Sequence, residues 1–184
     1  PGCIGKPTFN AKIIAVDENR NIIETSPKKT GLLASAGKMN MKGYWKDEEE
    51  TAAALSEGVV YTNDEIYFDE DGDIILLGRR GDVINVAGNK VSPDEIENAA
   101  KKIDGIADCG CVPEADALKG SIPKLFVEIK PGAKFDAVFI RESLSKSLEP
   151  YKVPQRIVQI DKIPRTFNGK IIRRKLMEAK QVKE

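Results

Sequence analysis

Residues 91–105 read VSPDEIENAAKKIDG and carry the clearest local signal in the chain. Ser92 is followed by a proline and, three positions on, by Glu95, which is the pattern of a capping box whose side chains bind amide groups at a helix start. Apolar residues then recur at helical spacing over residues 96–103, and an Asp-Gly pair supplies a stop. The segment therefore predicts an amphipathic helix over residues 93–103.

Downstream of this helix, the pattern alternates between strands and helices. Asp136 is placed to cap a second amphipathic helix, which is expected to end before Pro150. A basic stretch near the C-terminus predicts a short terminal helix. Strands are predicted at residues 106–112, 124–130 and 155–160. Residues 83–184 are therefore expected to form a small α+β domain with a central sheet of few strands.

The upstream part, residues 1–77, is predicted to be a small β-rich, barrel-like subdomain. The sequence DEDG at 69–72 is typical of a tight hairpin, and Asp47 is the expected N-cap of a short helix within residues 41–56. Short strands are predicted at residues 11–16, 22–23, 59–61 and 73–77. The charged, glycine-flanked residues 78–82 separate the two parts and are the expected hinge. The chain as a whole is predicted to be α+β.

The charged residues balance, because the 184 residues include 29 lysines and arginines and 29 aspartates and glutamates. A net charge of zero gives no overall field that would attract nucleic acid or an anionic membrane. No apolar run approaches the ~18 residues that cross a bilayer, and the N-terminus lacks the pattern of a signal peptide. We therefore expect a cytoplasmic protein with no integral membrane segment and no nucleic-acid partner.

The cysteines and the lack of histidine restrict the chemistry. Cys3, Cys109 and Cys111 have no C-x-x-C spacing, and the last two alternate along an apolar segment, which predicts buried strand positions. The chain contains no histidine, which excludes a Ser/His or Cys/His nucleophile pair and a His-liganded zinc within it. No metal site is predicted, and any chemistry here depends on Lys, Arg and Asp.

A proline-bounded loop near the C-terminus reads PRTFNGK at residues 164–170 and presents Lys170 at its end. Together with GRRGD at 78–82 and VSPDEIE at 91–97, this loop resembles the ligases that activate carboxylic acids as acyl-adenylates. That family includes acyl-CoA synthetases, luciferases and the adenylation domains of peptide synthetases. The ordered match runs over nearly the whole chain but begins partway into the family's pattern, so we expect the C-terminal part of a longer enzyme.

The resemblance implies that Lys170 is catalytic. Negative charge gathers between the attacking carboxylate and the α-phosphate of ATP during adenylation, and a flexible ammonium bridging both lowers the barrier. A lysine at an exposed turn is by itself more often merely solvated, and the other matching segments favour catalysis. The basic residues after the loop, Arg173, Arg174 and Lys175, are expected to form a solvated face beside it.

The sequence YTND at residues 61–64 resembles the family's aromatic-x-Thr-Gly-Asp segment, with asparagine in place of the usual glycine. The resemblance implies that Asp64 accepts both ribose hydroxyls of the nucleotide, because a carboxylate has two acceptor oxygens, with Thr62 beside it. Arg79 matches the family's arginine that contacts the nucleotide near the hinge. The alternative for Asp64 is a carboxylate that serves a turn at a strand end.

The hinge and the thiol site follow from the same resemblance. The family usually has Asp or Lys at the pivot, where this chain has Gly81, and the neighbouring Asp82 is one residue that could replace the missing latch. The sequence VAGNK at 86–90 resembles the loop that lines the tunnel for the pantetheine arm. This implies a pantetheine contact at Gly88 and a phosphate contact at Lys90, whereas the residues alone would favour a tight turn between two strands.

The function implied is that of an ATP-dependent acid–CoA ligase, in which Mg²⁺ is held mainly by the part upstream of this chain. Its partners would be a carboxylic acid, with fatty acids among the candidates, and CoA or an acyl-carrier protein. The fragment alone is expected to be inactive. The alternative is a stand-alone, non-catalytic lid that binds a nucleotide or a carrier protein. Gly81 favours this alternative, whereas the presence of both Asp64 and Lys170 counts against it.

Overall fold

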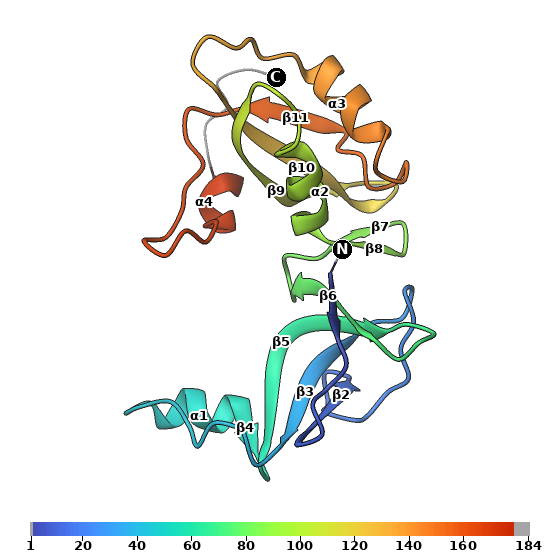
Figure 1. The fold of residues 1–184 in the computed structure, drawn as a ribbon, viewed down its shortest axis with the longest axis vertical. Coiled ribbons are helices and arrows are strands. Elements are labelled where there is room, and N and C mark those ends of the chain that lie inside the picture. Colours follow the sequence, from blue (N-terminus) through green and yellow to red (C-terminus); the bar gives the residue numbers. More distant parts are fainter. Residues whose placement is uncertain (1, 179–184) are drawn as a thin grey trace. The chain divides into compact units, whose positions relative to one another are not determined.

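The computed structural model describes residues 2–178 (Figure 1). The chain divides into two compact units, Pro1–Arg80 and Gly81–Glu184, each with its own sheet. The division falls inside segment 78–82, for which we predict a hinge. Most of the regular structure is strand, with four short helices in the described residues, so the chain has the expected α+β fold. None of these helices has the length and apolar character needed to cross a membrane.

The first unit contains an antiparallel sheet in the order β1-β6-β5-β3-β2, with β4 paired to β5. Its elements are β1 (Cys3–Gly5), β2 (Ala11–Val16), β3 (Gly31–Gly37), α1 (Glu48–Ala54), β4 (Leu55–Ser56), β5 (Val59–Phe68) and β6 (Ile74–Arg79). In the described residues, the end strands β1 and β2 do not pair with each other, so the sheet is open and the barrel-like prediction is corrected. The reason is the small core, in which only Ala15, Ile66 and Ile74 form a buried cluster. Such a core cannot fill a closed barrel.

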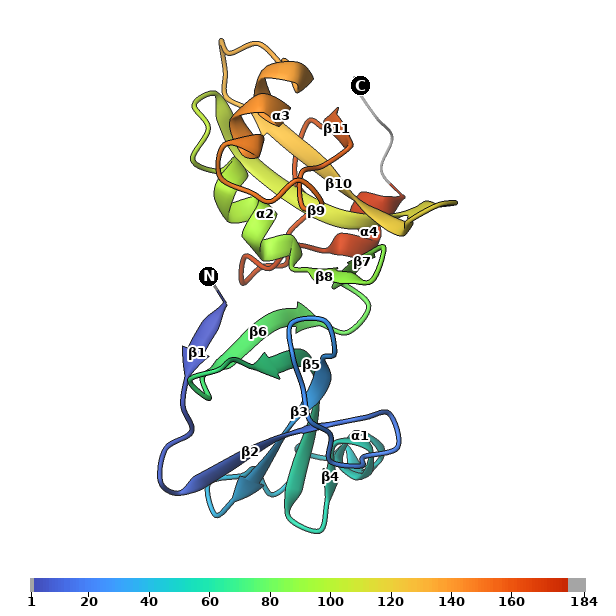
Figure 2. The ribbon, with the colours of Figure 1, turned by 90° about the vertical axis from the view of Figure 1, so that its right-hand side faces the viewer.

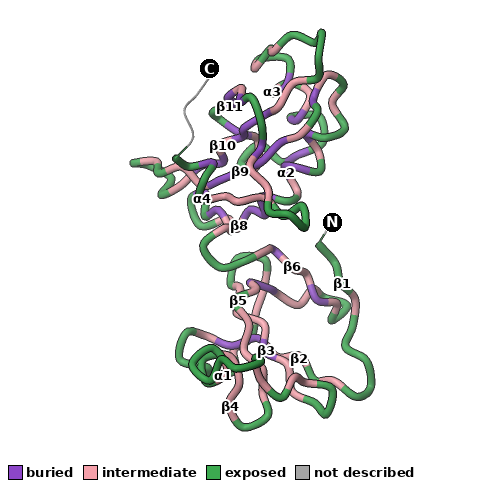
Figure 3. The backbone as a smooth tube through the Cα atoms, turned by 90° about the vertical axis from the view of Figure 1, so that its left-hand side faces the viewer, coloured by how far each residue is buried: buried purple, intermediate pink, exposed green. Residues whose placement is uncertain are grey.

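The helix and strands predicted for the first unit agree only in part with the structure. Strand β2 has the predicted bounds, and Asp47 caps α1 by accepting a hydrogen bond from the Glu50 amide at 2.9 Å. The helix is shorter than predicted, and its seven residues are exposed or half-buried (Figure 3). Strand β3, whose sequence is GLLASAG, was missed because its small residues have low strand propensity. Pairing with β2 on one side and β5 on the other forms this strand.

The hairpin between β5 and β6 forms where the sequence predicts it. The Asp69 carboxylate accepts from the amides of Asp71 and Asp73, and Gly72 turns the chain with φ +77°. Strand β5 is longer than predicted because it continues through residues 61–64. The YTND segment is therefore strand, and its pairing with β3 is irregular, with a shift of register between Tyr61 and Glu65.

The second unit has a sheet in the order β11-β10-β7-β8, with β9 paired along β10. The β10–β11 pair is parallel and the other pairs are antiparallel. Its elements are β7 (Ile84–Val86), β8 (Asn89–Val91), α2 (Pro93–Ala100), β9 (Ile106–Asp116), β10 (Gly120–Ile129), α3 (Ala137–Ser145), β11 (Arg156–Gln159) and α4 (Arg173–Met177).

Helices cover both faces of this sheet. Leu125 and Val127 of β10 pack with α2 and α3 in one buried cluster, whereas Phe126 between them packs with Leu176 of α4 in another. Because strand side chains alternate, α2 and α3 cover one face and α4 covers the other (Figure 2). The unit thus has a core on each side of the sheet.

The helix starts in this unit differ in their chemistry. Asp136 caps α3 as predicted, accepting from the Phe139 amide at 3.0 Å. The capping-box prediction for α2 is wrong, because the Ser92 side chain makes no capping hydrogen bond and Glu95 binds Lys152 at 2.9 Å. Proline at the first helical position and two acidic residues in the first turn start this helix instead.

Candidate functional site

The loop that carries Lys170, called here the lysine loop (residues 164–170), is a tight hairpin. The Thr166 amide donates to the Lys170 carbonyl at 2.8 Å, and the Gly169 amide donates to the Thr166 carbonyl at 2.9 Å. Gly169 has φ +83°, a conformation that favours glycine. Lys170 is exposed, and within residues 2–178 its ammonium makes no ion pair. The loop therefore presents a free cation on a defined backbone.

One leg of the lysine loop is fixed to strand β9 by an ion pair that sequence reasoning missed. Arg165 binds Asp108 through two hydrogen bonds of 2.7 Å and also donates to the Gly169 carbonyl. Burial raises the pKa of Asp108, but the Arg165 bonds and the Cys109 amide outweigh this, and the pKa is lowered overall. The sequence feature that could have indicated this pair is Asp108, a charged residue inside an apolar strand segment.

The other leg enters α4, where the prediction of a solvated basic face is wrong for one residue. The side chain of Arg173 is 14% exposed and binds Asp94 at 2.7 Å and Glu97 at 3.0 Å. Arg174 and Lys175 are exposed as expected. Successive helical residues point about 100° apart, so Arg173 can face α2 while Arg174 and Lys175 face solvent. Glu97 was identifiable because it lies on the apolar face of α2.

The predicted nucleotide-binding residues lie together in the first unit. Asp64 of β5 and Arg79 of β6 are partners in the strand register, and Arg79 Nε lies 3.2 Å from Asp64 Oδ1. The Thr62 hydroxyl donates to the Leu33 carbonyl at 2.9 Å and accepts from the Asp64 amide at 3.1 Å. Thr62 thus orients the backbone at Asp64, whose carboxylate is about one-third exposed beside a cation.

A hollow of about 260 Å³ in the same unit is lined by the sequence neighbours of this pair, Asn63 and Arg80, and not by Asp64 or Arg79 themselves. Thr62 and Arg80 are among its lining residues, and the Arg20 guanidinium stacks 4.3 Å above the Tyr61 ring. Asn63, at the position where the family has glycine, lies within strand β5. Because strand geometry is open to any L-residue, this substitution imposes no backbone strain here.

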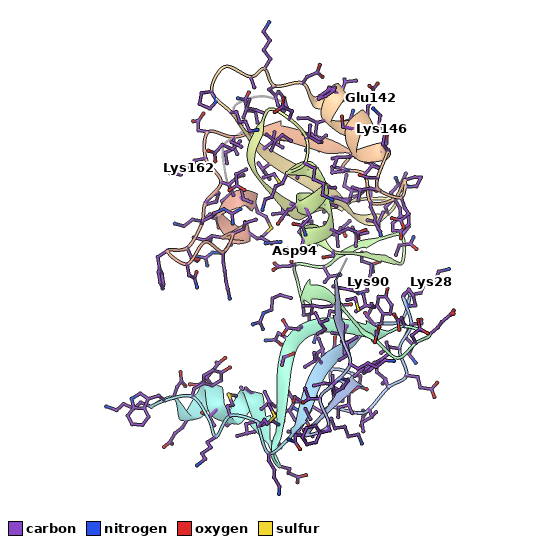
Figure 4. The ribbon with its side chains drawn as sticks, in the orientation of Figure 1. Lys28, Lys90, Asp94, Glu142, Lys146 and Lys162 are labelled. Atoms are coloured by element: carbon purple, nitrogen blue, oxygen red, sulfur yellow. The ribbon has the colours of Figure 1, made fainter. Side chains whose placement is uncertain are left out.

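The predicted pantetheine and phosphate residues lie on the β7–β8 hairpin of the second unit. Gly88 has φ +88° and forms the turn with Ala87, which has φ +49°. A Cβ at Gly88 would meet no atom within 4 Å. Lys90 is half-buried on β8 opposite Asn85 (Figure 4). The turn is open enough for an extended chain to approach its backbone, and both assignments stay predictions.

Of the predicted hinge residues, Gly81 has a left-handed backbone conformation. Gly81 has φ +91°, and a Cβ built there would meet nothing within 4 Å, so backbone conformation favours glycine at this position. Asp82 follows, with its carboxylate 3.9 Å from Arg173 Nε. The site residues therefore fall into two sets, with Thr62, Asp64 and Arg79 in the first unit and the others in the second.

Residues 95–170 match the model of the AMP-binding enzyme C-terminal domain. The long-chain-fatty-acid–CoA ligase of Bacillus subtilis is 34% identical over 97% of this chain and 32% of its own length. The 2-succinylbenzoate–CoA ligase of Geobacillus kaustophilus is 34% identical over 95% of this chain and 35% of its own length. The chain thus spans about a third of the length of these relatives.

Solved structures agree. The o-succinylbenzoate CoA synthetase of Bacillus subtilis, in complex with its acyl-adenylate intermediate, matches with a TM-score of 0.81 and 26% identity over 100% of this chain and 37% of that one. ATP-bound MatB of Rhodopseudomonas palustris matches with a TM-score of 0.73 and 26% identity over 97% of this chain and 35% of that one. The chain belongs to the AMP-binding, adenylate-forming ligase family and matches the C-terminal portion of its members.

Proposed function

We propose that this chain is the C-terminal part of an ATP-dependent acid–CoA ligase, which activates a carboxylate as an acyl-adenylate and transfers the acyl group to the thiol of CoA. The observation that carries this proposal is the exposed ammonium of Lys170 on a loop held at both legs by buried or half-buried ion pairs. The kinship with acyl-CoA ligases supports it. Fatty acids are among the candidate acids, and assays with a panel of acids would identify the substrate. An acyl-carrier protein is the alternative acceptor, and assays that compare it with CoA would distinguish the two.

The chemistry assigned to Lys170 is electrostatic. When the acid attacks the α-phosphate of ATP and pyrophosphate leaves, negative charge grows on the oxygens between the two reactants. A cation on a fixed loop stabilises this charge without reorganising solvent. Asp64, beside Arg79, supplies acceptors for the ribose hydroxyls and so orients the nucleotide. Mg²⁺ would be held mainly by residues upstream of this chain.

The two half-reactions use different parts of the second unit. We assign residues 1–77 to the subdomain that borders the nucleotide, 78–82 to the hinge and 83–184 to the mobile lid. Rotation about Gly81 and Asp82 would withdraw Lys170 after adenylation and present the Gly88 turn and Lys90 to the pantetheine arm of CoA. The left-handed, uncrowded Gly81 supports a pivot at this position.

The test is Lys170→Ala in the full-length ligase. We expect ATP–pyrophosphate exchange to fall about 100-fold or more, because one transition-state charge contact is lost. Thioester formation from a preformed acyl-adenylate should stay within about twofold of the parent rate, because that step makes no use of the lysine. Lys162→Ala, an exposed lysine close in sequence, is the matched control. Equal loss in both half-reactions overturns the assignment.

A non-catalytic nucleotide- or carrier-binding lid is the second candidate function. The geometry at Gly81 favours it, since no side chain there can latch one orientation. Titration of ATP and of a carrier protein into the purified chain tests it. Binding without any pyrophosphate exchange by the native full-length protein would support this candidate over the ligase.

A further inference from the structure

We propose that Arg173 is the positioning residue for Lys170, tying the second leg of the lysine loop to α2 and, through Asp82, to the hinge. The inference rests on the proposed ligase function and adds a residue role to it. The group formed by Arg173 with Asp82, Asp94 and Glu97 is called here the arginine cluster. All four residues belong to the second unit.

Arg173 is the first charged anchor after the catalytic lysine, and it follows Ile171, which pairs with Arg165 and packs against a buried cluster. Only two residues separate Arg173 from Lys170, and Arg173 begins helix α4. The Ile172 amide donates to the Pro164 carbonyl at 2.9 Å, which closes the base of the loop. Three residues span at most about 10 Å, so a fixed Arg173 limits where Lys170 can be.

The contacts of Arg173 are those of an anchor. Its Nη2 lies 2.7 Å from Asp94 Oδ1 and 3.0 Å from Glu97 Oε1, and the Glu97 side chain is only 6% exposed. The same Glu97 oxygen accepts from the Cys111 amide at 2.8 Å. One carboxylate oxygen thus joins α4, α2 and β9. Asp94 lies at the start of α2, at its lower end in Figure 4.

One donor of this anchor is unsatisfied. Arg173 Nε is buried, and in the part of the chain that the structure describes it has no hydrogen-bond acceptor. The closest carboxylate oxygen with which it forms an ion pair is Asp82 Oδ2, at 3.9 Å, which is beyond hydrogen-bond range. Buried donors without an acceptor are costly and uncommon. A shift of less than about 1 Å at Asp82 would satisfy it.

Asp82 can make this shift because it lies in the proposed hinge segment. Asp82 is 40% exposed and follows Gly81, where an added Cβ would meet no atom within 4 Å. Asp82 is therefore an adjustable member of the arginine cluster, whereas Glu97, only 6% exposed, is its fixed member. Closing the Asp82–Arg173 hydrogen bond would tie the start of α4, and with it the lysine loop, to the hinge segment within the second unit.

The experiment compares Arg173→Gln with Arg173→Lys in the full-length ligase, with Arg174→Gln as the matched exposed control. Adenylation is followed by ATP–pyrophosphate exchange, the second step by thioester formation from a preformed acyl-adenylate, and folding by thermal unfolding. Arg173→Gln should lower the kcat of adenylation by about 10-fold or more, because a displacement of about 1 Å misplaces the lysine. The KM for ATP and the thioester step should stay within about twofold.

The conservative variant and the exposed control test the positioning role further. Arg173→Lys should recover part of the adenylation rate, and Arg174→Gln should leave it unchanged. Equal losses in both half-reactions, or no loss, would overturn the positioning role. If Lys170→Ala has no selective effect, the proposed function fails first. If it has one and the Arg173 variants do not, only this inference fails.

A second variant protects the test against misfolding. Asp82→Asn leaves the buried Arg173–Glu97 pair intact and removes the hinge charge at an exposed position. We expect it to lower adenylation about three- to tenfold while thioester formation is retained, and Asp82→Glu to restore adenylation. If Asp82→Asn keeps the parent adenylation rate, the Asp82–Arg173 contact plays no part in positioning Lys170.

Discussion

Glu97 shows how the environment of a single residue sets a measurable property. Burial raises its pKa to about 7, and Arg173 and the Cys111 amide oppose this rise only in part. Asp94, on the same helix, repels the ionised form, and Lys101 favours it. The group therefore titrates near neutrality, far above an ordinary glutamate.

This shift predicts that the chain loses stability as the pH rises from about 4.5 to about 7. In that window the folded chain keeps a proton that the unfolded chain has released, so stability falls with pH, by roughly 3 kcal/mol at most. Urea unfolding at pH 5, 6, 7 and 8 measures the effect. Glu97→Gln should flatten the profile while keeping one acceptor oxygen for Arg173. A parent profile that rises over this range would contradict the expectation.

Asp64 gives a prediction about nucleotide binding in the full-length ligase. Asp64→Ala removes the proposed acceptors for the ribose hydroxyls, so we expect the KM for ATP to rise about 10- to 100-fold, from the loss of hydrogen bonds to a charged group. Steady-state pyrophosphate exchange measures it. Glu70→Gln, in the exposed β5–β6 hairpin, is the control. An unchanged KM would assign Asp64 a structural role.

Among the elements, α4 depends on close packing against β9. A Cβ at Gly110 of β9 would lie 2.5 Å from Leu176 Cδ1, and Leu176 is fully buried. The helix has five residues and cannot be stable alone. Packing of Leu176 over Gly110 therefore holds the helix that begins with Arg173.

Double-mutant unfolding experiments test this packing. Leu176→Ala should cost about 2–5 kcal/mol, and Gly110→Ala about 1–3 kcal/mol from the clash. The double variant should cost less than the sum, because the shortened side chain makes room for the new methyl group. Met177→Ala, at an exposed position, should cost little. Strict additivity would show that the two sites do not interact.

The β7–β8 turn yields a prediction about the second half-reaction. Gly88→Leu meets no neighbouring atom but forces a left-handed backbone, at about 1–2 kcal/mol. If the turn contacts pantetheine, this variant should lower thioester formation by about 10-fold or more and leave pyrophosphate exchange within about twofold. Gly88→Asn, which tolerates this backbone, is the control for strain. A loss of pyrophosphate exchange would count against the assignment.

At the scale of the whole molecule, the two units differ in the size of their cores. The second unit has buried clusters on both faces of its sheet, whereas the first has one cluster of three buried residues. Both units expose large apolar side chains, such as Phe9 (96% exposed) in the first and Leu118 (94% exposed) in the second, so the difference lies in the cores. Core size thus predicts unequal stabilities.

Residues 81–184 expressed alone should therefore fold and unfold cooperatively, because the apolar surface that they bury is contained within the unit. Circular dichroism and amide NMR spectra of this fragment measure it. The intact chain should show two thermal transitions, the first belonging to residues 1–80. A single transition in the intact chain, or an unfolded fragment, would contradict the division into independent units.

The sequence by itself determined the α+β class, strand β2, the caps at Asp47 and Asp136, the burial of Cys109 and Cys111, and the loop that presents Lys170. These features depend on residues within a few positions of one another, where periodicity, capping groups and turn residues act directly. The identification of the family also came from local motifs.

Tertiary structure alone decided the open sheet, strand β3 and the partners of the lysine loop. Arg165 meets Asp108 from 57 residues away, and Arg173 meets Glu97 from 76 residues away. No local pattern specifies such pairs, because a charged side chain is stable in solvent unless packing removes the water around it. Once β9, α2 and α4 are packed, the buried charges must pair, since an unpaired charge in the interior is far costlier than a paired one.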